Sequence, residues 1–539
     1  MSRMIGVRFG IFFLIALGAL SSLYAATPNN IYIAQNSAGA SNGAGCADAY
    51  PVTWFNNSAN WGNGSNQIGP GKTVHLCGTI TTELTFQGSG SSGSPIDLLF
   101  ETGASVQISP GEDANGAIGL GSNNFIVIDG GAGRPCGWDT ATNASEGTCN
   151  GQIENMLYGS SDATCPGGAC TTQATATSLI TGSGSNIEIR DLNVGPSYIH
   201  TSTGNGGNDV GGTGCISLLN GSNWNIHDNK LHDGSWCVTL TPTGSGSYSN
   251  WTIANNELYN NSHMVAIAGY GASSLNGLTM SGNYTHDMHN WDTTTYKWHA
   301  NSIHIFGCCS STYSNVTVNN NIMGGWGGLD VTAHIFAEQV ASMTNFHIFN
   351  NLMYWNGNTS GRLIFLEECD SGCYIFNNTL SADNNTAIQL GGPTNPVGGI
   401  NVENNFITNA FTLFDIETGP ITFGTLDHQV YGANTGNAWK YQGGFTSSFA
   451  TWKTETREGL FSTYAPSGVG LNSNYMLQAA SPAIGMGANL SNLGITALSS
   501  DLAGAPRSAS GPWDIGAYNY GSNSGSTIQP PTGVTATAQ

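Results

Sequence analysis

Two glutamates, Glu338 and Glu367, follow equivalent apolar segments of this 539-residue chain. Five such segments align by an alternating apolar pair: Val265/Ile267, Ile303/Ile305, Ile335/Ala337, Ile364/Leu366 and Ile388/Leu390. If the segments are neighbouring parallel strands in register, the backbones of the two glutamates lie about 4.8 Å apart on the outward face. That spacing is near the ~5–5.5 Å between the carboxyl groups of retaining glycosidases. One carboxyl group should then keep a raised pKa and act as general acid, while the other acts as nucleophile or base.

The outward residues beside these glutamates are a histidine and several aromatic residues. The alignment gives one outward column of Ala266, His304, Phe336, Phe365 and Gln389, and a next column of Ala268, Phe306, Glu338, Glu367 and Gly391. We therefore predict that His304 takes part in catalysis and that the three phenylalanines offer sugar rings an apolar platform. The carboxylates can instead bind Ca²⁺, which prefers oxygen ligands, or simply face water. No metal-ligand set is assigned from the sequence, and Ca²⁺ stays an alternative.

A second constellation lies in the longest loop within the repeats, just before the strand that carries the histidine of the first column. In this loop His289 or His299 can abstract the proton α to the carboxylate of a uronate. Lys297 or Arg362 can neutralise that carboxylate, and Trp298 can contact the sugar. This constellation predicts β-elimination, the reaction of a polysaccharide lyase, as the alternative to hydrolysis.

Hydrogen bonding alone is the competing interpretation of the histidines near this loop. His286 aligns with Tyr259 and His232 of the preceding repeats, and Asp287 aligns with Asn260 and Asp233. Such a ladder of His and Asp residues can stabilise stacked turns without any chemistry.

The elements that must position these residues are repeats of one sequence motif. The motif is a strand of alternating apolar residues that ends in an Asn pair or its equivalent. The copies begin at Ser185, Ser222, Ser249, Ser314, Thr344 and Gly399. The loops between the copies differ in length, and no helical period is sustained, as expected for a β solenoid. Asn at matching positions suits left-handed turn residues and can hydrogen-bond along the stack. The sequence therefore predicts stacked parallel strands around one core.

This repeat resembles the secreted bacterial right-handed parallel β-helix proteins of the pectate-lyase-like superfamily. The resemblance implies an all-β fold, a right-handed parallel β-helix with an N-terminal cap and a C-terminal closing segment. His299-Ala-Asn-Ser-Ile-His304 resembles the His-x-Asp-Gly-Ile turn of β-helix enzymes, but Asn301 stands where Asp is usual and Ser302 where Gly is usual. The segments around Ser481, Asp501 and Asp514 resemble the closing segment of such proteins. We expect a hydrogen-bond network of Asp501, Arg507 and Asp514 at the end of the stack.

Five regions follow from this organisation. Residues 1–25 have the pattern of a secretory signal peptide, because Arg3 and Arg8 precede a short apolar run that is followed by small residues. Residues 26–120 should form the N-terminal cap and first coils, residues 121–430 the β-helix repeats, and residues 431–521 the closing segment. Residues 522–539 should form a linker or the start of a further module. After removal of the signal peptide, no remaining apolar run is long enough to span a bilayer.

Composition narrows the range of partners. The formal charge of −21, with 33 acidic against 12 basic residues, argues against nucleic acid as a partner. The small number of Lys and Arg residues also argues against the hypothesis of a polysaccharide lyase, because these side chains bind uronate carboxylates.

The 12 cysteines form an even set, which suits disulfides in an exported protein. We expect Cys215–Cys237 across neighbouring coils and three loop staples, namely Cys136–Cys149, Cys165–Cys170 and Cys369–Cys373. Cys46 and Cys77 bracket the cap region, and the adjacent Cys308 and Cys309 remain unassigned.

Together these features predict a secreted or extracellular, monomeric β-helix protein that cleaves glycosidic bonds of a polysaccharide, with hydrolysis favoured. Elimination by the histidine loop is the alternative within the enzyme class. A noncatalytic solenoid that binds glycans or forms part of a surface is the alternative from a different class.

Overall fold

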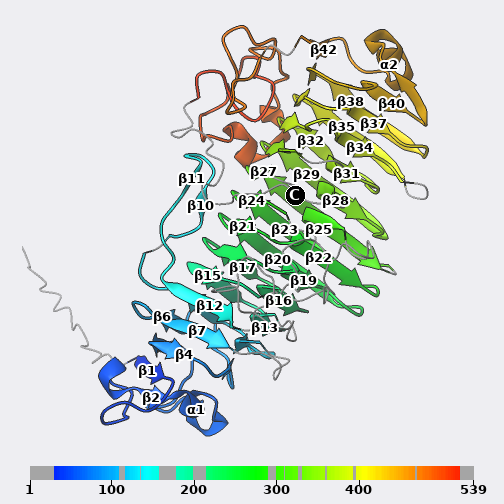
Figure 1. The fold of residues 1–539 in the computed structure, drawn as a ribbon. Coiled ribbons are helices and arrows are strands. Elements are labelled where there is room, and N and C mark those ends of the chain that lie inside the picture. The colour runs from blue at the N-terminus through cyan, green and yellow to red at the C-terminus, as the bar shows by residue number, and fades with distance from the viewer. Residues whose placement is uncertain are drawn as a thin grey trace, which may run out of the picture.

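The chain folds as the right-handed parallel β-helix that the sequence predicted (Figure 1). The computed structural model describes residues 29–522 apart from 109–115, 134, 157–177, 198–213, 289–298, 309, 326–330, 358–360, 393–395 and 468–469. Within these residues nearly every element is a strand, and the strands stack into three long sheets that wind around one core. The predicted signal peptide, Cys165, Cys170, Cys309 and the segment after residue 522 lie outside the described residues.

The first sheet contains the strands that end in the Asn pairs, and all its neighbours pair in parallel. In spatial order its strands are β2 (Tyr50–Pro51), β1 (Asn30–Ala34), β3 (Thr73–Cys77), β6 (Ile96–Phe100), β9 (Ile126–Asp129), β14 (Ile187–Arg190), β17 (Trp224–His227), β20 (Ser247–Ala254), β23 (Ser274–Ser281), β26 (Thr312–Asn319), β29 (Ser342–Phe349), β32 (Tyr374–Phe376), β35 (Val397–Glu403) and β38 (Ile421–Asp427).

The second sheet consists of short strands that directly follow the Asn pairs. In spatial order they are β4 (Thr79–Ile80), β7 (Ser105–Ile108), β12 (Gly151–Asn155), β15 (Leu192–Val194), β18 (Lys230–His232), β21 (Glu257–Tyr259), β24 (Tyr284–His286), β27 (Ile322–Gly324), β30 (Leu352–Tyr354), β33 (Thr379–Ser381), β36 (Phe406–Thr408), β39 (Val430–Tyr431) and β42 (Thr463–Tyr464).

The third sheet carries the predicted site residues and lies on the right in Figure 1. In spatial order it contains β13 (Ile180–Gly182), β16 (Ile216–Leu219), β19 (Trp236–Thr241), β22 (His263–Tyr270), β25 (Ala300–Cys308), β28 (Val331–Glu338), β31 (Arg362–Leu366), β34 (Thr386–Leu390), β37 (Thr412–Ile416), β40 (Trp439–Tyr441) and β41 (Gly444–Thr446). Two further strand pairs are β5 (Leu84–Thr85) with β8 (Ile118–Gly119), next to β13 through the hydrogen bond from Leu120 N to Thr181 O, and β10 (Trp138–Asp139) with β11 (Ala144–Ser145).

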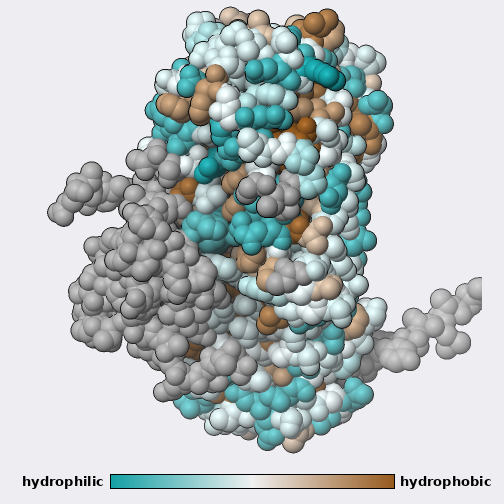
Figure 2. Space-filling model, turned by 90° about the vertical axis from the view of Figure 1, so that its right-hand side faces the viewer, coloured by the Kyte–Doolittle hydropathy of each residue, from teal (hydrophilic) through white to brown (hydrophobic). Residues whose placement is uncertain are grey.

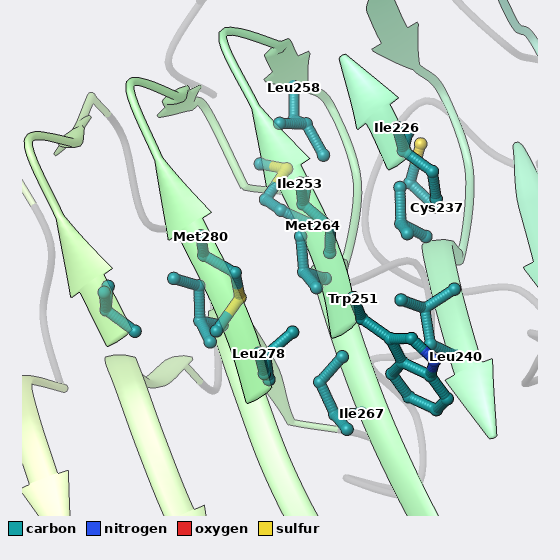
Figure 3. Close-up of a cluster of buried hydrophobic side chains, with 14 of the residues drawn as sticks. Ile226, Cys237, Leu240, Trp251, Ile253, Leu258, Met264, Ile267, Leu278 and Met280 are labelled. Carbon is teal, nitrogen blue, oxygen red and sulfur yellow. The ribbon is translucent and has the colours of Figure 1, made fainter. Parts of the chain in front are cut away.

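The core is a continuous column of apolar side chains from all three sheets, because each coil can bury only the inner face of its strands. Figure 3 shows one section of it. Ile253 of the first sheet, Leu258 of the second and Ile267 of the third lie within this core, and all are inaccessible to solvent. Two consecutive residues of β22, Met264 and Val265, both belong to the core. The strict alternation of a strand is therefore broken at this position.

A ladder of buried amides runs along the turn between the first two sheets. Its members are Asn229, Asn256, Asn283, Asn321, Asn351, Asn378, Asn405 and Gln429. Each asparagine Nδ2 donates to the side-chain oxygen of the next member at 2.9–3.1 Å. The preceding residue takes a left-handed conformation, as at Asn255, Asn320 and Asn350. The predicted role of the Asn pairs is thus confirmed.

Both ends of the stack are covered. At the N-terminal end, the helix α1 (Val52–Phe55) and Trp61 contribute Val52, Phe55 and the Trp61 ring to the core. At the other end, α2 (Phe449–Thr456) places Trp452 against Phe414 and Trp439. Single turns of 3-10 helix occur at Cys46–Asp48, Ser58–Asn60, Ser491–Leu493 and Thr496–Ser499. No helix within the described part of the chain is long and apolar enough to cross a membrane.

The segment after β42 lies beside the flank of the helix, at the upper left in Figure 1, rather than over its end. Arg507 donates to Asn350 Oδ1 at 2.9 Å, to Asn519 Oδ1 at 3.0 Å and to backbone carbonyls of the segment. Asp501 accepts from the backbone N–H groups of Ala505 and Asn519. Arg507 also donates to Asp514 O at 3.4 Å, and the charges of Asp501 and Asp514 partly offset the lowering of its pKa by burial. The expected network of these three residues therefore lies along the flank and not at the end of the stack, because the Asn residues of the turns offer hydrogen bonds there.

Four disulfides lie within the described residues: Cys46–Cys77, Cys136–Cys149, Cys215–Cys237 and Cys369–Cys373. The last three pairings confirm the prediction. Cys215–Cys237 joins β19 to the residue just before β16, with a Cα separation of 4.6 Å. This bond therefore ties two neighbouring coils together.

Candidate functional site

The strand register of the third sheet agrees with the alignment made from the sequence. Val265 pairs with Ile303, Ile303 with Ile335, and Ile335 with Ile364. His304, Phe336 and Phe365 consequently stand side by side in one outward column. Figure 2 views the molecule from the side on which this sheet lies in Figure 1, and hydrophilic and hydrophobic residues are interspersed there. We call the outward surface of β22, β25, β28, β31 and β34 the candidate face.

The rings of the first column form a continuous stack across this face. The His304 ring lies 5.1 Å from that of Phe336 at an interplanar angle of 8°, and Phe336 lies 4.8 Å from Phe365 at 16°. The Arg362 guanidinium lies over the Phe365 ring, 5.1 Å from its centroid. Phe306 lies at the edge of the stack, with its ring 4.5 Å from that of His304. The predicted aromatic residues are thus brought together.

Glu338 lies beside the stack and is held by two side chains. Its Oε1 atom lies 3.1 Å from His304 Nε2 and 4.0 Å from His299 Nε2. Its Oε2 atom accepts from Gln339 Nε2 at 2.9 Å. The Glu338 side chain is 15% exposed, and burial raises its pKa although the Gln339 hydrogen bond lowers it. Glu338 is therefore a fixed carboxyl group at the edge of solvent.

Glu367 occupies the next coil, and its backbone N–H donates to Ala337 O at 2.9 Å. Burial raises its pKa, and the nearby charge of Glu338 raises it further. Gly392 makes room for this side chain, since a Cβ atom there would lie 3.0 Å from Glu367 Cδ. The two glutamates therefore interact electrostatically, as the sequence predicted.

A third carboxyl group, Glu368, was not predicted. Its side chain is buried and accepts from the backbone N–H of Val340 at 2.5 Å, and burial raises its pKa to about 7. Its position in the sequence, directly after Glu367, was the feature that could have identified it as a neighbour of the site. Because Glu368 is bound to the backbone of a turn, it supports the coil that carries Glu338.

Arg362 is less free than the sequence suggested. Its Nε donates to Gln389 Oε1 at 2.6 Å, and Gln389 Nε2 donates to Glu417 Oε1 at 3.3 Å. Lys440 forms ion pairs with Glu417 at 2.5 Å and with Asp415 at 3.2 Å. A polar chain thus continues the candidate face toward the C-terminal coils.

Three histidines gather at the other end of the face. One ring nitrogen each from His263, His299 and His304 lies within 4.8 Å of the other two. Asn301 Nδ2 lies 2.7 Å from His299 Nδ1 and 3.3 Å from His263 Nε2. Burial lowers the pKa of all three rings, so they are neutral at pH 7.

The sequence did not predict His263 as a site residue, because strict alternation counted back from the buried Val265 places the His263 side chain in the core. The pairing of His263 with Asn301, two residues before Ile303, was the signal that could have revealed it.

Three residues of the predicted histidine loop, His289, Lys297 and Trp298, lie outside the described residues. The neighbouring ladder is visible: the His232 ring stacks on Tyr259 at 4.9 Å, and the Tyr259 ring on His286 at 5.3 Å. His286 Nδ1 lies 2.9 Å from Asp287 Oδ2, and the His286 side chain is buried. This geometry fits the hydrogen-bonding interpretation of the ladder.

Comparison with solved structures finds a similar chain at low sequence identity. A solved chain described as "Crystal structure of pectate lyase Pel9A" is similar over 92% of this chain and 100% of its own length, with a TM-score of 0.43 and 12% sequence identity. No protein-family description and no curated protein matches the sequence.

Proposed function

We propose that the candidate face binds a polysaccharide and cleaves its glycosidic bonds by hydrolysis, with Glu338 and Glu367 as the reacting carboxyl groups. The observation that carries this proposal is that two carboxyl groups with raised pKa values interact on adjacent coils beside a stack of rings. Such a pair of carboxyl groups is what glycoside hydrolysis requires.

The surroundings of the two groups assign different roles to them. Glu367 is the better general acid, because both burial and the charge of Glu338 favour its protonated form. Glu338 is the better nucleophile or base, because the side chains of His304 and Gln339 can donate hydrogen bonds to its carboxylate form. His304 acts by holding Glu338 in place, and it stacks on the aromatic platform at the same time.

A neutral or weakly charged glycan is the substrate class that we propose. The formal charge of the chain is −21, and the acidic residues Asp415 and Glu417 continue the face. A polyanion would be repelled by this surface. The Phe336 and Phe365 rings can instead pack against the apolar faces of sugar rings.

Elimination on a uronate is the second candidate, and one observation favours it. His299 is neutral, its side chain is 39% exposed, and it lies on the face where Arg362 stands, so it can accept a proton once its Nδ1 releases the hydrogen bond from Asn301 Nδ2. The Arg362 cation would then neutralise the uronate carboxylate.

We further propose that the protein is exported and acts as a monomer outside the cytoplasm. The four disulfides support this, because such bonds persist in oxidising compartments. The predicted signal peptide has the same implication.

The test is product release by the purified chain on a panel of neutral and uronate polysaccharides. New reducing ends without the ultraviolet absorbance of unsaturated uronates indicate hydrolysis, whereas both signals together indicate elimination. Neither signal from a folded chain would leave a glycan-binding or structural solenoid and would refute the proposal.

The variants Glu338→Gln and Glu367→Gln should each lower hydrolysis by about 10²–10⁴-fold. Glu403→Gln is the matched control, because burial raises the pKa of Glu403 to about 7 but this residue belongs to β35 of the first sheet. Equal losses in the control would show that the effect is one of folding and not of chemistry.

A further inference from the structure

The histidines at the end of the candidate face form a set of nitrogen ligands. His263 lies on β22, His304 on β25, and His299 directly before β25, so two neighbouring coils supply them. One nitrogen of each ring lies within 4.8 Å of the other two. Three nitrogens around a tetrahedral Zn²⁺, each about 2.0–2.1 Å from the metal, are roughly 3.4 Å apart. Closing the set around such an ion therefore shortens the largest of these separations by up to about 1.4 Å.

Two of these rings carry a nitrogen that nothing in the described part of the chain satisfies. His263 is 1% exposed and His304 is 4% exposed, yet the Nδ1 atoms of both rings have no hydrogen-bond partner. Buried polar atoms are nearly always paired, because an unpaired one loses its hydration without compensation. His304 Nδ1 is available to an ion, whereas His263 has to give up the hydrogen bond that its Nε2 accepts from Asn301 Nδ2, because that bond leaves the proton of the neutral ring on Nδ1.

The Glu338 carboxylate beside the cluster is a group that supports a metal ligand. His304 Nε2 lies 3.1 Å from Glu338 Oε1, and a carboxylate can only accept a hydrogen bond. The neutral ring therefore carries its proton on Nε2 and presents a lone pair at Nδ1. This carboxylate–histidine arrangement orients a ligand and raises its basicity. Asn301 Oδ1 accepts from Ala333 N at 3.1 Å, so its Nδ2 donates to His299 Nδ1 and to His263 Nε2, and an ion at either nitrogen has to displace that hydrogen bond.

We propose that His263, His299 and His304 bind one divalent transition metal ion of the Zn²⁺ class. Neutral imidazoles suit Zn²⁺, Co²⁺ and Ni²⁺, whereas Ca²⁺ takes six to eight oxygen ligands. Three protein ligands leave a fourth position of a tetrahedral ion open. His299 is the solvent-accessible member of the set, with 39% of its side chain exposed, so that position faces the same surface as Glu338. This site goes beyond the proposed hydrolysis and does not depend on it.

The test is metal binding by the tag-free, disulfide-intact chain, measured without any substrate. The protein is first dialysed against a chelator, and Zn²⁺ is then titrated by calorimetry, with Co²⁺ in a parallel experiment read by visible absorbance. We expect one Zn²⁺ per chain and the strong absorbance of tetrahedral Co²⁺. Calcium at the same concentration should not compete.

Two variants probe the ligands without removing the fold. His299→Ala changes the exposed ligand, and His304→Phe keeps a ring in the stack with Phe336. Each should lower the affinity for Zn²⁺ by more than about tenfold. His347→Ala is the control, since that histidine lies on β29 of the first sheet and stacks on Tyr374.

Three results would overturn the proposal: no saturable binding of Zn²⁺ by the folded wild-type chain, wild-type affinity in His299→Ala or His304→Phe, or an equal loss in His347→Ala. Because no turnover is measured, failure of the hydrolysis proposal would leave this result unaffected.

Discussion

The buried amide ladder makes a quantitative prediction about stability, and Asn321→Ala is the change that tests it. Asn321 is 1% exposed and lies in the middle of the ladder. Its Nδ2 donates to Met280 O at 2.9 Å and to Asn351 Oδ1 at 3.0 Å. Its Oδ1 accepts from both the backbone N–H and the Nδ2 of Asn283, each at 2.9 Å. Truncation removes all these bonds.

The magnitude follows from which groups find another partner. Asn283 Nδ2 keeps its bond to Ile253 O at 2.9 Å, but the backbone N–H of Asn283 is left unpaired in the interior. An orphaned buried donor costs about 1–3 kcal/mol, and each other lost hydrogen bond about 0.5–1.5 kcal/mol. We therefore expect Asn321→Ala to lower the free energy of unfolding by about 4 kcal/mol.

The assay is equilibrium urea denaturation of the oxidised chain, followed by both tryptophan fluorescence and far-ultraviolet circular dichroism so that partial unfolding is detected. Asn276→Ala is the matched control in the neighbouring coil. Asn276 is exposed and accepts one hydrogen bond, from Asn315 Nδ2 at 2.6 Å. Its substitution should change stability by less than about 0.5 kcal/mol. A loss below about 1 kcal/mol for Asn321→Ala would refute the reasoning that the ladder stabilises neighbouring coils.

Three further predictions concern charge, covalent links and the metal. Burial alone would lower the pKa of His227, but hydrogen bonds to Asp228 and Glu188 outweigh it and raise the pKa to about 9. The stabilisation that this cation provides should be fully present below the usual pKa of about 6.5 and should be lost as the pH rises through 9. The melting temperature should therefore fall over this pH range, and His227→Gln should remove that fall. The paired change Cys215→Ser with Cys237→Ser, which opens a loop spanning 22 residues, should lower the free energy of unfolding by about 3 kcal/mol in urea; an unchanged midpoint would contradict a stabilising link between coils. Glu338→Gln should weaken Zn²⁺ binding by about 10–100-fold in calorimetry, because it replaces the carboxylate beside His304, while Glu403→Gln should not; equal affinity in both would remove Glu338 from the support of the site.

Most residues of the candidate face could be predicted from the local alternation of apolar and polar residues in the sequence. Strands alternate with a period of two, so the apolar pairs of the repeats identified which residues point outward and which coils are neighbours. The column of His304, Phe336 and Phe365 was correct for this reason. The pairing of Cys215 with Cys237 followed from the same register. The catalytic and binding roles that we assign to these residues stay predictions.

The sequence by itself determined the solenoid, its register and the outward position of Glu338 and Glu367, because these depend on alternation and turn chemistry within single repeats. The tertiary structure decided what those patterns do not encode. It brought His263 to His299 and His304 by a break in alternation at Met264 and Val265, and it placed the closing segment along the flank through Arg507 and the Asn residues of the turns. The first outcome depends on an irregularity of packing between two neighbouring coils, and the second on contacts between segments 157 residues apart in the sequence; local periodicity carries no information about either.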